Sequence, residues 1–168
     1  TLSDLERAYA KPPDSTRQVL HPEQYWKEGG STSPVLTLPD LAPALGPGWK
    51  RTLEGSIGEL GLAVLTGSNQ RLAMPWAFLP SRWTNAAAVG NAGDAYQHYV
   101  NGEQKVTVLL TRWESPSEAE EFGQALVRKN RYFVRYGVNF LMLSGDFGDK
   151  AEALATAAMA GRSFYADE

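Results

Sequence analysis

Alternating apolar and polar residues predict two β-hairpins in the second half of the chain. The first hairpin turns at Asn101-Gly102, where the glycine supplies the positive φ that a tight turn requires. The second turns at Gly137. Both faces of the run 105–113 carry apolar residues, so we expect it to be an inner strand. The four strands are predicted at 94–99, 105–113, 132–136 and 138–143.

Between the hairpins the apolar spacing changes to that of a helix. Ser115 is a suitable cap, Pro116 fits the first helical position, and Glu118 completes a capping box. Residues 146–149 precede a closing helix of similar pattern. The two apolar stripes consist of Ala119, Phe122 and Leu126 in the first helix, and Ala151, Leu154, Ala155, Ala158 and Met159 in the second.

This order of elements (strand, strand, helix, strand, strand, helix) predicts an α+β fold in which two helices cover an antiparallel sheet. The first 70 residues differ, because seven of the ten prolines lie between 12 and 47. We therefore predict a loop-rich N-terminal segment with short helices at 1–70 and an α+β domain at 71–168. Within the first segment, helices are predicted at 2–9, 16–20 and from Gly58 to Gly67, and strands at 34–39 and 49–56.

Composition and charge exclude several classes of function. The net charge is −3 and the sequence pI is about 5.5, which argues against a general nucleic-acid binder. The chain has no cysteine, so disulfides, thiol catalysis and Cys-ligated metal centres are excluded. No apolar run approaches the roughly 20 residues that a membrane-spanning helix needs. We expect neither a nucleic-acid partner nor a membrane span.

Four polar residues are candidates for a site. Ser15 and His21, with Asp14, supply the residue types of a hydrolase triad, but such residues in a proline-rich turn are more typical of helix caps and loop hydrogen bonds. Glu59 is a candidate acid or base, or it meets the free amides at the start of its helix. Asp94, in a glycine-rich bend, either binds a ligand or belongs to the turn.

Two aromatic residues and a histidine complete the candidates. Trp76 and Trp83 lie in the irregular stretch 68–84, where they either line a groove for a sugar or peptide or fill the core beneath a loop. His98, within a predicted strand, is more typical of a cross-strand residue than of a metal ligand.

The run 12–25, Pro-Pro-Asp-Ser-Thr-Arg-Gln-Val-Leu-His-Pro-Glu-Gln-Tyr, resembles a segment of uncharacterised bacterial proteins related to gluzincin-type zinc metallopeptidases, many of them exported. The resemblance continues at Gly58-Glu59-Leu60-Gly61 and at 86–96. In that family the segment follows a His-Glu-x-x-His helix. This chain has no such motif, and its two histidines are not at ligand spacing, so the zinc chemistry does not carry over.

The resemblance implies a non-catalytic, scaffolding or partner-binding portion of an exported bacterial metallopeptidase-like protein. It implies an upstream peptidase-like module, or another protein chain, as the partner, with self-association as a further expectation. We expect no cofactor and no metal. Two alternatives remain open: a small hydrolase using Glu59, His21 or Asp94, or a ligand-binding module using the loop from Trp76 to Trp83.

Overall fold

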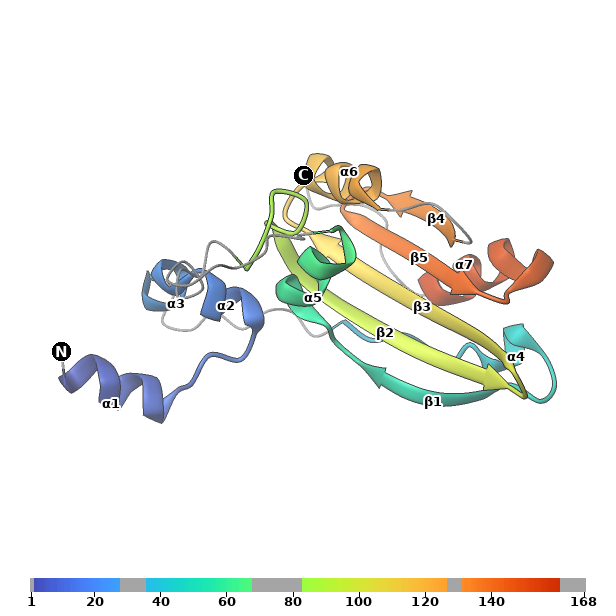
Figure 1. Ribbon diagram of the computed structural model, residues 1–168, viewed down its shortest axis with the longest axis horizontal. Coiled ribbons are helices and arrows are strands. Elements are labelled where there is room, and N and C mark those ends of the chain that lie inside the picture. Colours follow the sequence, from blue (N-terminus) through green and yellow to red (C-terminus); the bar gives the residue numbers. More distant parts are fainter. Residues whose placement is uncertain (1, 28–35, 68–82, 127–130, 161–168) are drawn as a thin grey trace.

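The computed structural model of this protein describes residues 2–27, 36–67, 83–126 and 131–160 (Figure 1). Its centre is a five-stranded antiparallel sheet in the order β1-β2-β3-β5-β4. The strands are β1 (Lys50–Gly55), β2 (Asn91–Asn101), β3 (Gln104–Trp113), β4 (Arg131–Tyr136) and β5 (Asn139–Gly145). The predicted α+β class and the inner position of β3 are confirmed.

The helices lie on both faces of this sheet and beside it. They are α1 (Leu2–Ala10), α2 (Thr16–Leu20), α3 (Pro22–Lys27), α4 (Ala42–Leu45), α5 (Gly58–Leu65), α6 (Pro116–Ala125) and α7 (Ala151–Met159), which follows the short 3-10 helix η3 (Gly148–Lys150). Residues on both faces of β3 are buried and pack into two different clusters, so each face of the sheet has its own core. Val106, Val108 and Leu110 pack with α4 and α7, whereas Leu109 and Trp113 pack with α5 and α6. The two helices predicted to cover the sheet, α6 and α7, therefore lie on opposite faces.

The sheet extends further upstream than the predicted domain boundary at residue 70. β1 pairs with β2 from Lys50↔Val100 to Gly55↔Tyr96, so the division into 1–70 and 71–168 separates β1 from its own sheet. β2 also begins earlier than predicted, at Asn91, because the glycine-rich bend is a bulged strand start with a register shift between Asn91 and Gly93.

The strand predicted at 34–39 is wrong for the part that the structure describes, 36–39. These residues join no strand. The carbonyl oxygen of Leu38 accepts a hydrogen bond from the side chain of Gln97 (3.1 Å) in place of a ladder bond. The hydroxyl of Tyr99 lies 2.7 Å from Gln97 Oε1 and accepts a bond from the Leu41 amide (2.8 Å). These polar contacts fix the segment against the sheet.

Residues 2–27, here called the arm, lie to one side of the sheet (Figure 1). α2 packs against α5, whereas α1 projects outward and has no buried residue. The predicted helices at 2–9 and 16–20 are confirmed as α1 and α2. Within the described ranges, none of the helices is both long and apolar enough to cross a bilayer.

Candidate functional site

His21 and Glu59 connect the arm to the domain. His21 is the C-cap residue directly after α2, and its imidazole Nε2 lies 2.8 Å and 3.1 Å from the two carboxylate oxygens of Glu59 in the first turn of α5. Glu59 is only 1% exposed, and the hydroxyl of Thr84 donates a second bond to it (2.5 Å). A carboxylate buried this deeply is tolerated only because donors surround it.

Three further polar contacts, made by Arg17 and Thr16, hold α2 in place. One guanidinium nitrogen of Arg17 donates to the carbonyl oxygen of Asn91 (3.2 Å), and the other pairs with Glu114. The hydroxyl oxygen of Thr16 accepts a bond from the Leu60 amide (3.4 Å). We call these contacts, together with the pair of His21 and Glu59, the arm joint.

The start of α5 is capped from the neighbouring strand. Asp94 on β2 is buried, and its carboxylate accepts bonds from the hydroxyl of Ser56 (3.0 Å) and from the amides of Ile57 (2.7 Å) and Gly58 (2.9 Å). The expectation that Glu59 meets these amides is therefore wrong. Asp94 takes that role, and Glu59 is left to bind the arm.

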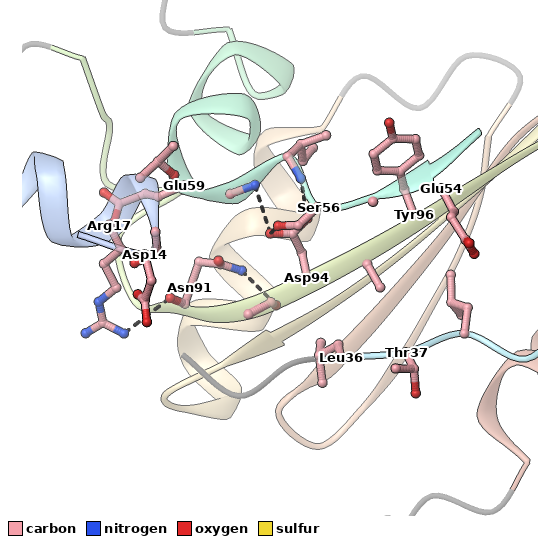
Figure 2. A pocket seen from close by; sticks show the side chains of 18 of the residues that line it. Asp14, Arg17, Leu36, Thr37, Glu54, Ser56, Glu59, Asn91, Asp94 and Tyr96 are labelled. Atoms are coloured by element: carbon pink, nitrogen blue, oxygen red, sulfur yellow. Dashed lines mark hydrogen bonds between the residues drawn. The ribbon is translucent and has the colours of Figure 1, made fainter. Parts of the chain in front are cut away.

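A cavity of about 730 Å³, here called the cleft, lies where the arm meets the sheet (Figure 2). It is formed by the start of α2, the segment 36–38, the junction between β1 and α5, and the first half of β2. Buried polar side chains line it together with exposed ones. The lining side chains discussed below are Asp14, Arg17, Glu54, Glu59, Asn91 and Asp94.

The structure brings four of the seven candidate residues to this region. Ser15, Glu59 and Asp94 line the cleft, and His21, which does not line it, binds Glu59. Trp83 does not line the cleft and is 41% exposed. Trp76 lies outside the described residues. His98 is a cross-strand residue, because its Nδ1 lies 2.8 Å from the hydroxyl of Thr107 on β3.

The local chemistry favours a structural joint over a catalytic relay. The hydroxyl of Ser15 caps α2 by accepting a bond from the Gln18 amide (3.3 Å). The two ring nitrogens of His21 face Glu59 and, at 3.6 Å, Glu23, so neither is directed to the Ser15 hydroxyl. Among the residues that the structure describes, no group of three His, Asp or Glu side chains could hold a metal ion.

Thr84 and Arg17 were not predicted as parts of the site. Each contributes through a partner that is distant in the sequence, by 25 residues for the pair Thr84 and Glu59 and by 74 for the pair Arg17 and Asn91. A local pattern gives no signal for such contacts.

No curated protein and no solved structure matches this chain. Residues 49–150, which run from just before β1 to the end of η3 and make up more than half of the chain, match a protein family. The match includes Glu59 and Asp94, and it leaves out the arm and α7. The chain belongs to the family described as Domain of unknown function (DUF8575).

Proposed function

We propose that this chain is the non-catalytic, partner-binding portion of an exported bacterial metallopeptidase-like protein, and that the arm makes the contact. The observation that carries this proposal is an exposed apolar stripe on α1. Leu2, Leu5 and Tyr9 follow one another at spacings of three and four residues, so they share one face of the helix. Their exposed fractions are 80%, 54% and 81%.

α1 is too short to be stable through its own hydrogen bonds. Isolated helices of fewer than about 12 to 15 residues are marginal in water, and α1 has nine residues, none of them buried. It contacts α3 through Arg7, whose guanidinium lies 4.7 Å from the ring centroid of Trp26 and donates to the Trp26 carbonyl (3.0 Å). A folded partner covering the stripe would supply the burial that α1 lacks.

The attachment of the arm suits a docking element. The arm joint consists of directional polar contacts around a buried carboxylate, which fix the orientation of α2 relative to the sheet. The run 12–25, which resembles the metallopeptidase-related proteins, lies within this arm. That resemblance is our reason for proposing a peptidase-like module as the partner.

Site-specific photo-crosslinking tests the proposal. A photoreactive amino acid replaces Tyr9 on the apolar stripe or, as the matched control, Asp4 on the opposite face of the same helix, in a bacterium that exports the protein. We expect a crosslink to a peptidase-like module, upstream in the same polypeptide or on another chain, from position 9 only, and we expect Leu5→Asp to abolish it. Equal labelling from both positions, or a product in which no peptidase-like module is crosslinked, contradicts the proposal.

A small hydrolase is the second candidate, because Glu59 and Asp94 line one cleft and His21 binds Glu59. The engagement of both carboxylates by donors of the chain itself weighs against it. Chromogenic esters, peptides and glycosides test this candidate. Turnover that is lost in both His21→Gln and Glu59→Gln, with folding retained, would establish a hydrolase and reject the non-catalytic function.

A further inference from the structure

We propose that the cleft binds an extended, positively charged peptide segment of another protein, which adds a short strand to the edge of β2 between Gly93 and Ala95. This inference goes beyond the proposed function, because it concerns a surface distinct from the apolar stripe of α1. It rests on three features of the described residues: an unpaired strand edge, a cavity beside that edge, and the charge of its lining.

The first feature is the edge of β2. β1 pairs with β2 only as far as Gly55↔Tyr96, although β2 begins five residues earlier, at Asn91. The chain leaves the sheet at Ser56, because the carboxylate of Asp94 holds the next two amides at the start of α5. Among the described strands, none pairs with 91–95 on this side of β2, where Asp94 directs its backbone N–H and C=O outward. The carbonyl oxygens of Asn91 and Gly93 accept bonds from the side chains of Arg17 (3.2 Å) and Asn91 (3.1 Å), so Asp94 supplies the open backbone groups. Unpaired backbone groups at a sheet edge are a template for an added strand.

The second feature is the space beside this edge. The cleft extends along the start of β2 and is bounded on another side by the segment 36–38 (Figure 2). Its volume of about 730 Å³ is within the range of about 300 to 1,000 Å³ that is usual for ligand sites. Gly93 and Ala95 carry little or no side chain, so another backbone can approach β2 closely there. An extended segment therefore fits better than a helix.

The third feature is the charge of the lining. Four carboxylates (Asp14, Glu54, Glu59 and Asp94) and one guanidinium (Arg17) line the cleft, which is a formal charge of −3. Arg17 is also paired with Glu114. Asp14 and Glu54 are the exposed carboxylates, and the ion pair of Glu54 with Arg51 is solvent-exposed and therefore weak. A cleft lined by charges of one sign concentrates ligands of the opposite charge, so a basic segment is the occupant.

The outer edge of β1 is a poorer template for an added strand. A register shift between Arg51 and Leu53 bulges the strand, and its side chains include Lys50, Arg51 and Glu54. Bulges and charged residues are the features by which natural sheets protect their edges from pairing. The segment 91–95 has a register shift as well, but it lies between Asn91 and Gly93, before the proposed contact.

The experiment uses the 168-residue chain and two fluorescent hexapeptides, Lys-Val-Lys-Val-Lys-Val and Glu-Val-Glu-Val-Glu-Val, with fluorescence anisotropy as the readout. We expect the basic peptide to bind and the acidic one to bind at least about tenfold more weakly. The double variant Asp14→Asn/Glu54→Gln should weaken the binding of the basic peptide about tenfold. The matched control Glu103→Gln/Glu121→Gln changes the net charge equally at exposed positions outside the cleft, and it should leave binding unchanged.

Backbone pairing is tested separately from charge. Two further basic peptides carry N-methyl groups on the odd or on the even residues, so that one of them cannot donate to β2. We expect one methylated peptide to lose binding, and the hydrogen exchange of the Asp94 amide to slow when the parent peptide binds, because Gly93 and Ala95 face β3 in the register of this hairpin. Three results would each overturn the proposal. The basic peptide does not bind, both methylated peptides bind as tightly as the parent peptide, or the bound peptide protects amides in β1 or β4 in place of the Asp94 amide.

Discussion

The imidazole Nε2 of His21 lies 2.8 Å from Oε1 of Glu59, although 38 residues separate the two in the sequence. This contact places a buried carboxylate at the boundary between the arm and the sheet. A carboxylate without donors in such a position is costly, so Glu59 favours the arrangement in which α2 covers it. The pair therefore specifies where the arm docks.

Removing the imidazole should destabilise the protein. His21→Ala leaves Glu59 with Thr84 as its remaining described side-chain donor, and we expect a loss of about 2 to 4 kcal/mol in the free energy of unfolding. Urea denaturation followed by circular dichroism measures it. His98→Ala is the control, since His98 is half-buried and contacts Thr107, and it should cost less than about 1 kcal/mol. Equal losses in the two variants would show that the pair has no special role.

The cap of α5 leads to a second prediction. Asp94→Ala removes the acceptor for two backbone amides and one hydroxyl, and we expect a loss of about 2 to 3 kcal/mol in the free energy of unfolding. Hydrogen exchange should accelerate first in the amides of Ile57 and Gly58. Asp149→Ala, at an exposed position in η3, should change stability by less than about 0.5 kcal/mol. Unchanged exchange in Asp94→Ala would contradict the capping role.

The elements that sequence predicted well are those determined by local contacts. Ser115 and Glu118 form both bonds of the expected capping box, with Glu118 N to Ser115 Oγ at 3.3 Å and Ser115 N to Glu118 Oε2 at 2.8 Å. The alternation along β3 likewise determined which of its side chains reach each core. Such features depend on residues one to four positions apart, and a sequence shows them directly.

The candidate site was only partly predictable, because its geometry depends on contacts between distant segments. A local rule assigned the free amides of α5 to Glu59, which lies in the first turn of that helix. Asp94 instead reaches them from β2, 36 and 37 residues further along the chain. Once Asp94 occupies the helix start, Glu59 is free to bind His21. The residue types could be identified from sequence, but their partners could not.

The buried phenol of Tyr99 predicts a loss of stability at high pH. Burial raises the pKa of Tyr99 from 10.0 to about 12. Below pH 10 the phenol is protonated in both states; between pH 10 and 12 the unfolded chain releases this proton while the folded chain retains it, so stability falls as pH rises. The loss should reach about 2 to 3 kcal/mol.

Denaturant titrations from pH 8 to 12 measure this effect of Tyr99. Tyr99→Phe should have a flatter dependence of stability on pH than the parent chain, whatever its stability at pH 8. Tyr9→Phe is the control, because Tyr9 is 81% exposed and its loss should leave the slope unchanged. The prediction is contradicted if, over this pH range, the free energy of unfolding of the parent chain falls no faster than that of Tyr99→Phe.

A close approach between α2 and α5 gives the most specific test of the arm joint. Gly58 has a φ of +62°, and a Cβ atom added to it would lie 2.3 Å from the hydroxyl oxygen of Thr16. Gly102 has nearly the same φ, +60°, with open space around it.

We expect Gly102→Ala to cost about 1 to 2 kcal/mol of stability from backbone strain alone, and Gly58→Ala to cost about 1 to 3 kcal/mol more from the clash. In a double-mutant cycle, Thr16→Ala should recover that excess in the Gly58→Ala background, whereas it should be additive with Gly102→Ala. Additive behaviour in both backgrounds, measured by urea denaturation, would mean that α2 does not lie against α5 in solution as it does in this structure.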